Sequence, residues 1–328
     1  MKIAIVKLSA LGDIVHAMVA LQFIKKHYPD AEIDWIVEDR FKSVLAHNPH
    51  IHQIHSVHLK AIKQQKSLTR LWAEFKKIRQ LGDYDVAIDA QGLIKSALVA
   101  RLLKAKKVVG FDKHSIRESL ASWFYDDKIH IAYHENTIDR NVAVCCQPLG
   151  ISVSHQAIVE KQPFLFYKSH FQPPEAPYVV FIIGSTWESR CYPKEKFVQL
   201  ANGLQQTCWV AWGNAQEQEK AEWMAQQSSY IQVLPKLDLN DLKKLIDCCN
   251  LLIGNDTGPT HMAWGLNRPS ITLFGPTPVN RIYQTAINKA IKSPSKVDHY
   301  ALDKNDFSIM TIEATVIVEM AQQLITHG

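Results

Sequence analysis

The alternation of short apolar runs with helix-forming stretches constrains the fold of this sequence more than any other feature. In the first half, runs expected to be strands are separated by segments that repeat apolar residues at helical spacing. The expected strands are residues 3–6, 33–37, 86–88 and 108–110, and the expected helices are 13–26, 68–81 and 93–103. Near-continuous apolar strands that alternate with helices predict an α/β fold with a parallel, doubly wound sheet.

The alternation stops once, around residues 166–177, and then resumes. The segment FQPPEAP in this stretch has three prolines in seven residues, which is typical of a linker. Beyond it, strands are expected at residues 178–183, 207–212, 230–233, 251–254 and 270–274, and helices at 194–205, 215–227, 240–248, 260–265 and 312–325. We therefore expect two Rossmann-like domains, residues 1–168 and 169–310, that face a central ligand-binding cleft. Residues 311–328 are expected to form a C-terminal helix that packs back toward the first domain.

Composition places the chain among globular, non-membrane proteins. Hydrophobic residues make up 47% and charged residues 21% of its 328 residues. No apolar run approaches the roughly 18–20 residues that span a bilayer, and the sequence goes directly from Met1 into a strand-like run instead of a signal peptide. The six cysteines have neither zinc-site nor disulfide-scaffold spacing. We expect a cytosolic protein.

The net charge of +5 is unevenly distributed. Residues 60–79 contain seven cations against one acid, Glu74, and a second basic cluster occupies residues 101–117. Such a surface favours an anionic partner: a phosphorylated substrate, an acidic membrane or a nucleic acid. A nucleic-acid platform would interleave aromatic residues with the cations, and this pattern is missing from the sequence.

The first motif, VKLSALGD, joins the first expected strand to the first helix. It places Lys7, Ser9, Gly12 and Asp13 at the carboxyl end of the strand, where ligands bind in open α/β sheets. The turn has one glycine and therefore lacks the dinucleotide fingerprint, which disfavours a nicotinamide dehydrogenase. Asp13 has two interpretations that its position cannot separate: a carboxylate that stabilises a helix N-terminus, or a general base.

The second motif, GNDTGPTHMAWG, follows a buried strand and begins a helix. Backbone N–H groups and hydroxyls at a helix start form a cradle for phosphate. The residues that would form this anion site are Asp256, Thr257, Gly258, Thr260 and His261. The Asp-Thr-Gly triplet also occurs in aspartic proteases, but those need two carboxylates in β hairpins, and here there is one copy in a strand-to-helix turn.

The third motif, GSTWESRCYPKEKF, follows the first strand of the second half. Ser185, Thr186 and Arg190 combine hydroxyls with a guanidinium where a strand ends, a combination that suits a pyrophosphate leaving group. A surface arginine in a loop is the alternative interpretation.

With these motifs in place, the sequence resembles glycosyltransferase family nine, the heptosyltransferases of lipopolysaccharide core synthesis. The resemblance covers essentially the whole chain and rests on IVKLSALGDIVHAMVAL, DWIVEDRF, YDVAIDAQGLIKSALVARL, RESLASWFY, WGNAQEQEKAEWMA, VLPKLDLNDL and NDTGPTHMAWGLNRPSITLFGPT. It implies the GT-B fold, with the acceptor held by the N-terminal domain and the nucleotide-sugar by the C-terminal one. It further implies inverting, metal-independent transfer of L-glycero-D-manno-heptose from ADP-heptose to the first 3-deoxy-manno-octulosonic acid (Kdo) of Kdo2-lipid A. No cofactor is implied.

The resemblance also implies roles for individual residues. Asp13 matches the general base, and Arg190 falls where family members carry a lysine that binds pyrophosphate. Residues implied to bind the donor are Ser185, Thr186, Glu217 on the ribose, Leu234 and Lys236 beside the adenine, and Asp256, Thr257, Gly258, Thr260 and His261. Residues implied to bind the acceptor are Ser9, Gly12, Lys60, Lys63, Gln91, Lys95 and Arg117.

Two alternatives to this implied function remain at this point. The acceptor could already carry one heptose, although the segment DAQGLIKSA favours the bare one. From another class, the chain could be a non-enzymatic nucleotide- or nucleic-acid-binding α/β protein. For the leading hypothesis, the expected partners are ADP-heptose, Kdo2-lipid A and the anionic inner face of the inner membrane, with peripheral, salt-sensitive association and no nucleic acid.

Overall fold

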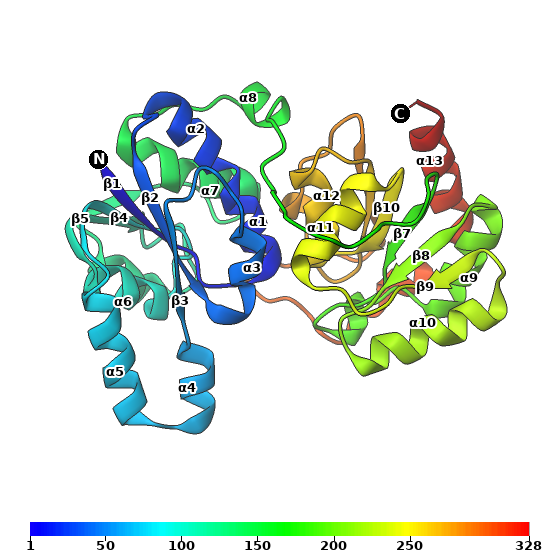
Figure 1. The fold of residues 1–328 in the computed structure, drawn as a ribbon, viewed down its shortest axis with the longest axis horizontal. Coiled ribbons are helices and arrows are strands. Elements are labelled where there is room, and N and C mark those ends of the chain that lie inside the picture. Colours follow the sequence, from blue (N-terminus) through cyan, green and yellow to red (C-terminus); the bar gives the residue numbers. More distant parts are fainter. Residues whose placement is uncertain (328) are drawn as a thin grey trace. The chain divides into compact units, whose positions relative to one another are not determined.

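Each half of the chain forms its own six-stranded parallel sheet in the computed structural model (Figure 1), which describes residues 1–327. The chain divides between Phe166 and Tyr167 into two units, unit 1 (Met1–Phe166) and unit 2 (Tyr167–Gly328). The expected α/β class, with two Rossmann-like domains, is confirmed. The division lies two residues before the expected boundary at 168.

In unit 1 the strand order is β3-β2-β1-β4-β5-β6, with every neighbouring pair parallel. The strands are β1 (Lys2–Val6), β2 (Glu32–Glu38), β3 (Gln53–Val57), β4 (Asp83–Asp89), β5 (Lys104–Phe111) and β6 (Asp127–Ile129). The helices are α1 (Leu11–Met18), α2 (Ala20–His27), α3 (Lys42–Leu45), α4 (Leu59–Gln65), α5 (Leu68–Arg79), α6 (Ile94–Leu102), α7 (Thr137–Cys146) and α8 (His155–Val159), with 3-10 turns η1 (Asp39–Phe41), η2 (Ser119–Phe124) and η3 (Gln147–Leu149).

Unit 2 has the same winding, in the order β12-β11-β10-β7-β8-β9. Its strands are β7 (Val179–Ile182), β8 (Cys208–Ala211), β9 (Ile231–Val233), β10 (Leu251–Asn255), β11 (Ser270–Phe274) and β12 (Asn288–Lys292). Its helices are α9 (Lys194–Leu204), α10 (Ala215–Gln227), α11 (Leu239–Cys248), α12 (Gly258–Gly265) and α13 (Ala314–His327), with 3-10 turns η4 (Glu188–Arg190), η5 (Val279–Arg281) and η6 (Ser308–Thr311).

The sequence patterns miss three edge strands, one largely buried helix and the short helices α3, α4 and α8. The strands β3, β6 and β12 lie at or next to sheet edges and are only partly buried, so they lack a continuous apolar run. The helix α7 begins with polar residues and is almost entirely buried, so it shows no clear apolar face. The helix expected at residues 13–26 is two helices, α1 and α2, separated at Val19.

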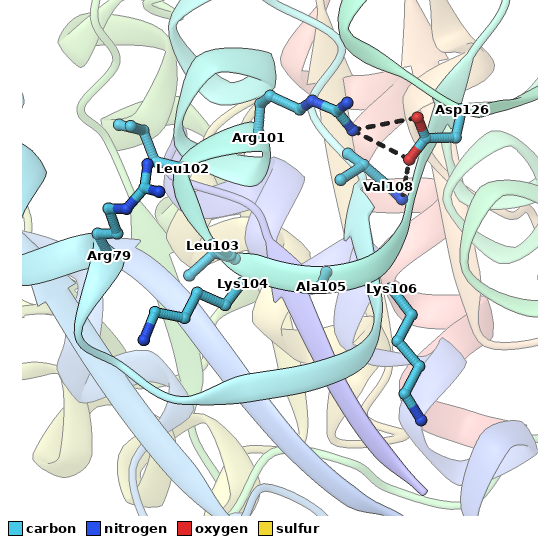
Figure 2. Close-up of a pocket in the computed structure, with 9 residues that line it drawn as sticks. All are labelled: Arg79, Arg101, Leu102, Leu103, Lys104, Ala105, Lys106, Val108 and Asp126. Atoms are coloured by element: carbon cyan, nitrogen blue, oxygen red, sulfur yellow. Dashed lines mark hydrogen bonds and ion pairs between the residues drawn. The ribbon is translucent and has the colours of Figure 1, made fainter.

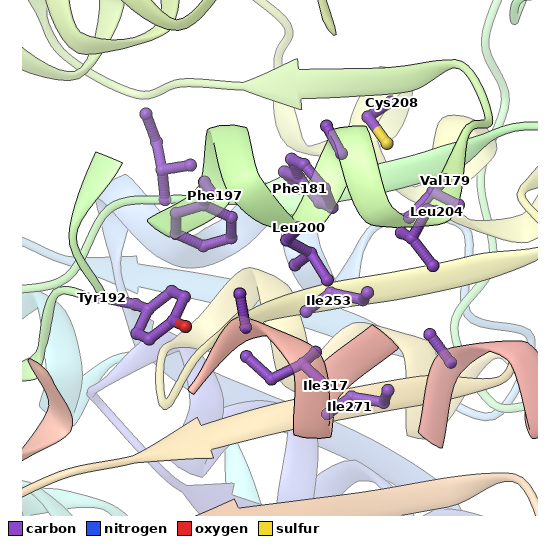
Figure 3. Close-up of a cluster of buried hydrophobic side chains, with 14 of the residues drawn as sticks. Val179, Phe181, Tyr192, Phe197, Leu200, Leu204, Cys208, Ile253, Ile271 and Ile317 are labelled. Atoms are coloured by element: carbon purple, nitrogen blue, oxygen red, sulfur yellow. The ribbon is translucent and has the colours of Figure 1, made fainter. Parts of the chain in front are cut away.

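The C-terminal helix packs within unit 2. Ile317, Ala321 and Leu324 of α13 belong to the buried core of this unit together with Phe197 and Leu200 of α9. Figure 3 shows Ile317 in this core with Phe197 and Leu200. Their spacing places them on one face of α13. The apolar face of α13 is covered by α9 of the same unit. Packing of residues 311–328 toward the first domain stays a prediction. Within residues 1–327, no helix combines the length and apolarity needed to span a bilayer.

Candidate active site

The strand order of each unit defines where a ligand is expected. In both sheets the winding reverses between the first and fourth strands, β1 and β4 in unit 1 and β7 and β10 in unit 2. Ligands of doubly wound folds bind beyond the carboxyl ends of strands at such a switch point. The first motif follows β1, the third follows β7 and the second follows β10, so all three lie at a switch point.

Asp13 lies in the first turn of α1, at the carboxyl end of β1. Its Oδ2 accepts a hydrogen bond of 3.2 Å from the backbone N–H of Ala10, so it caps this helix start, and its side chain is only half-buried. Gly12 precedes it in the same turn. The interpretation of Asp13 as a carboxylate that stabilises the helix N-terminus is therefore confirmed. The carboxylate also keeps lone pairs that could accept a hydrogen bond from a ligand hydroxyl.

Lys7, at the end of β1, is buried beneath this turn. Its Nζ donates to Ala90 O (2.6 Å) and Asn141 Oδ1 (3.0 Å), and so joins β1 to the loop after β4 and to α7. Burial lowers the pKa of Lys7, while the nearby negative charge of Asp13 acts in the opposite direction. Lys7 thus lies close enough to Asp13 for the charges of the two groups to interact.

Gln91 is engaged by the backbone of the same turn. Its Oε1 accepts hydrogen bonds from the N–H groups of Leu8 (2.7 Å) and Ser9 (3.2 Å), and its Nε2 lies 3.4 Å from Ser9 Oγ. Asp89, which is fully buried, in turn accepts from the N–H of Gln91 at 2.8 Å. Burial raises the pKa of Asp89, and its hydrogen bonds act in the opposite direction. Gln91, expected to bind acceptor, therefore holds the loop that leads to Asp13.

The remaining predicted acceptor residues are exposed cations at the carboxyl edge of the first sheet. Lys60 and Lys63 lie on α4, Lys95 on α6, and Arg117 in the loop before η2. The backbone N–H of Lys60 donates to Glu38 Oε1 at 3.0 Å, and burial raises the pKa of Glu38 while the charge of Lys95 lowers it. These cations are available to an anionic acceptor.

In unit 2 the central feature is an ion pair between the third and second motifs. Arg190 Nη2 lies 2.7 Å from Asp256 Oδ2 and also donates to the backbone oxygen of Asp256. Both side chains are withdrawn from solvent, with exposures of 13% for Arg190 and 2% for Asp256. The pair bridges the loops that follow β7 and β10, at the switch point of the second sheet.

Asp256 has further partners that keep it ionised. His261 Nε2 lies 3.0 Å from its Oδ1, and Thr277 Oγ1 donates to its Oδ2 at 2.7 Å. Burial alone would raise the pKa of Asp256, but the Arg190 guanidinium and the bond with His261 hold it well below its usual range. Asp256 and His261, expected to bind donor, thus also fix the orientation of Arg190.

The start of α12 can bind an anion. Thr257 is its N-cap residue, yet the Thr257 side chain makes no capping hydrogen bond, and Gly258 is the first helical residue. Uncapped N–H groups and the helix dipole favour a phosphate at this position. Thr260 has another role, because its buried hydroxyl donates to Asn255 O at 2.7 Å.

The loop after β7 carries the remaining phosphate candidates. Among residues 1–327, Ser185 Oγ is buried without a hydrogen-bond partner. Thr186 is exposed, and its Oγ1 lies 3.5 Å from Arg190 Nη1. The carboxylate of Glu217 lies so close to Gly184 that a Cβ there would overlap it. Glu217 also accepts from Gly213 N–H (2.7 Å) and Asn214 Nδ2 (2.7 Å) at the start of α10, so this ribose candidate is held in place before any ligand binds.

The adenine candidates lie after β9. Leu234 is buried and its carbonyl accepts from the indole N–H of Trp212 at 2.7 Å, while the exposed Lys236 has its Nζ 6.0 Å from the centre of the Trp212 ring. The bond from its indole fixes the Trp212 ring beside the loop after β9, and an aromatic ring of this kind can stack on a flat base.

Several residues of this site were missed from the sequence. Asp89, Asn141 and Asn255 link segments that are far apart in sequence. Asp89 accepts from Tyr125 OH at 2.7 Å, and Asn255 accepts from Tyr192 N–H at 2.9 Å and donates to Ile183 O at 2.7 Å. Polar residues at the carboxyl end of a predicted strand were the available signal for Asp89 and Asn255. No pattern in the sequence distinguishes Asn141 from other helical asparagines.

Comparison with known proteins shows the family of this chain. The model of glycosyltransferase family 9 (heptosyltransferase) matches residues 71–304. Lipopolysaccharide heptosyltransferase 1 of Campylobacter coli is 37% identical, over 99% of this chain and 99% of the relative. The protein of the same name from Escherichia coli K12 is 32% identical over 84% of this chain and 88% of the relative.

A solved structure gives the same result. The structure described as E. coli heptosyltransferase WaaC with ADP superimposes with a TM-score of 0.83 at 27% identity, over 99% of this chain and 100% of the other. The chain therefore belongs to glycosyltransferase family 9, the heptosyltransferases, and it is a glycosyltransferase with the two-domain GT-B fold.

Proposed function

We propose that this enzyme transfers L-glycero-D-manno-heptose from ADP-heptose to the first Kdo of Kdo2-lipid A in the inner core of lipopolysaccharide. Family membership supports the reaction class. The similarity to relatives named lipopolysaccharide heptosyltransferase 1, and to a WaaC structure that contains an ADP-heptose analogue, supports this donor and this position in the core. The bare acceptor is favoured over one that already carries a heptose.

The observation that carries the proposal is the cluster of Arg190, Asp256 and the start of α12 at the switch point of unit 2. Negative charge grows on the β-phosphate as ADP leaves, and a guanidinium with two fixed partners stabilises that charge without reorganisation. The N–H groups at the start of α12 and the unpartnered hydroxyl of Ser185 supply further donors. Such a cluster can replace the divalent cation that many nucleotide-sugar transferases use.

Unit 1 supplies the acceptor side of the reaction. A Kdo hydroxyl attacks the anomeric carbon of heptose, the bond from that carbon to the ADP oxygen breaks, and ADP leaves with the bonding electrons. Asp13 accepts the hydroxyl proton as general base. Because attack and departure occur on opposite faces, the anomeric configuration inverts. The exposed Lys60, Lys63, Lys95 and Arg117 then neutralise carboxylate and phosphate groups of the acceptor.

The acceptor of this reaction is an anionic lipid, so the enzyme is expected at the cytoplasmic face of the inner membrane as a peripheral protein. A basic surface adds on the order of 1 kcal/mol per residue near an anionic bilayer, and this term is screened by salt. Nucleic acid is not a proposed partner.

The test is a transfer assay with ADP-heptose and two acceptors, bare and once-heptosylated, each with and without EDTA. Faster transfer to the bare acceptor, undiminished by EDTA and with an inverted anomeric centre by NMR, is the expected result. Preference for the heptosylated acceptor would assign the second step of the core instead. Loss of activity with EDTA would reject the charge-stabilising role given to Arg190 and α12.

A further inference from the structure

The helix α5 carries an apolar stripe that no part of unit 1 covers. Leu68 and Trp72 are 72% and 73% exposed, while Glu74 and Ile78 on another face of the helix are buried. Trp72 contacts the half-buried Phe75 edge-on, with ring centroids 6.3 Å apart. Leu68, Trp72 and Phe75 are separated by four and three residues, so they lie along one side of the helix.

The same side of α5 leads to a basic hollow. Arg79, at the end of α5, lines a pocket of about 340 Å³ together with Arg101, Lys104 and Lys106 (Figure 2). Arg101 is engaged by Asp126 at 3.0 Å, and Lys106 by Asp85 at 2.7 Å. Among residues 1–327, neither Arg79 nor Lys104 forms an ion pair, and in Figure 2 they lie away from the Arg101–Asp126 pair.

Charge is concentrated in the segment that contains both features. Residues 60–128 hold 15 Lys and Arg against 8 Asp and Glu, a net charge of +7. The whole chain carries +5, so the other residues sum to −2. The apolar stripe and the hollow therefore lie within the one strongly cationic segment of the sequence.

We propose that α5 is the membrane-docking element of this enzyme and that it rests on an anionic phospholipid bilayer. Leu68 and Trp72 enter the interfacial region, where tryptophan side chains are favoured, and the phosphate of a lipid headgroup occupies the hollow between Arg79 and Lys104. This inference rests on the proposed function insofar as the acceptor is carried by a lipid. A lipid surface would contact both the exposed apolar stripe and the basic hollow beside it, which is large enough for a phosphate group. A nucleic acid would contact the cations alone and would leave the apolar stripe exposed.

Co-sedimentation with vesicles tests the proposal. Vesicles of equal parts phosphatidylglycerol and phosphatidylcholine are compared with vesicles of pure phosphatidylcholine, and the wild-type protein is expected to bind only the former. Trp72→Ser should weaken binding about tenfold through lost apolar burial. Arg79→Glu combined with Lys104→Glu should weaken it at least about 25-fold, since each basic residue near an anionic surface is worth about fivefold.

Matched controls distinguish the specific loss of the α5 stripe and the basic hollow from the loss of any exposed tryptophan or any two surface cations. Trp123 on η2 is 78% exposed, so Trp123→Ser removes an equally exposed indole away from α5 and should leave binding unchanged. Lys26→Glu with Lys128→Glu makes the same charge change at two other exposed positions and should weaken binding much less. Thermal unfolding of each variant shows that it is folded.

Transfer to a short, delipidated acceptor separates this inference from the proposed function. The α5 variants should transfer heptose to the soluble acceptor at the wild-type rate while they lose vesicle binding. Vesicle binding that survives both Trp72→Ser and the Arg79→Glu, Lys104→Glu pair, or equal binding to pure phosphatidylcholine, would overturn the docking proposal. Binding of a short DNA duplex in place of vesicles, with the same residue dependence, would also overturn it.

Discussion

The two units have the same strand order, but different interactions hold the loops at their switch points. In unit 1 the turn after β1 is held by hydrogen bonds from its backbone to Gln91, above the buried Lys7. In unit 2 the corresponding turn after β7 is held by an ion pair, Arg190 with Asp256. The same topology thus presents a carboxylate with one backbone partner in one unit and a guanidinium held by a buried carboxylate in the other.

This difference fits the two halves of a transfer reaction. A general base must reach a mobile hydroxyl, so its carboxylate needs lone pairs that the protein does not use, as in Asp13. A group that stabilises developing phosphate charge must be oriented beforehand, so it needs rigid partners, as Arg190 has. Under the proposed function, the polar residues at the switch points, and not the strand order, distinguish the two roles.

The strongest way to break this comparison is to replace the proposed base. Asp13→Asn keeps an oxygen that can cap α1 but cannot accept a proton, so kcat should fall about 10²–10⁴-fold. Steady-state kinetics and calorimetric binding of ADP would measure this. Unchanged turnover, or lost ADP binding, would contradict the division of roles between the units.

The next largest effect is expected at Arg190. Arg190→Gln should lower kcat/KM about 10²–10³-fold, because it removes the charge that faces the leaving pyrophosphate. Arg190→Lys keeps a point charge without the planar fork and should recover part of the loss. If Gln and Lys were equally harmful, the fork geometry would matter more than the charge.

The ion pair between Arg190 and Asp256 should also contribute to the free energy of unfolding. Arg190→Gln leaves Asp256 buried without its main cation, and the free energy of unfolding should fall by about 3 kcal/mol near neutral pH. The pKa of Asp256 is depressed in the folded state, so the stability from this pair is present above the unfolded pKa of about 3.9 and is lost as pH falls below it. Denaturant unfolding from pH 7 to pH 3 should therefore show a steeper decline for the wild-type protein than for Arg190→Gln, and parallel curves would refute the assignment.

A smaller effect is expected at Gln91 in the first unit. Gln91→Leu removes the acceptor for the N–H groups of Leu8 and Ser9 and should lower kcat about tenfold, with little change in either KM. Gln91→Glu keeps an accepting oxygen and should retain most of the rate. A raised KM for the acceptor with normal kcat would instead support the sequence prediction that Gln91 binds the acceptor directly.

The smallest effect concerns the loop that holds the ribose candidate. A Cβ at position 184 would overlap the carboxylate of Glu217, so Gly184→Ala should displace that side chain and raise the KM for ADP-heptose about fivefold, equivalent to about 1 kcal/mol. Gly213→Ala is the matched control, since its Cβ would lie 3.4 Å from Glu217 Oε2, an ordinary contact. Equal effects of the two changes would remove Glu217 from the donor site.

Much of this protein is determined by its sequence. The strands β1, β4, β7 and β10 each contain a short apolar run and are followed by helices, so the class, the number of domains and the three motif loops could be predicted. Carboxyl ends of parallel strands lie at one edge of a sheet, and this rule placed Asp13, Arg190 and Asp256 correctly at switch points.

Only the tertiary structure decided which of these residues contact one another. Arg190 and Asp256 are 66 positions apart, and the pairing of Lys7 with Asn141 spans 134 positions. Strand order and loop packing create such contacts, and local patterns carry no information about them. For the same reason the sequence could not show that α13 packs on α9. An apolar face on a helix indicates that the face is buried, but it does not indicate which element covers it.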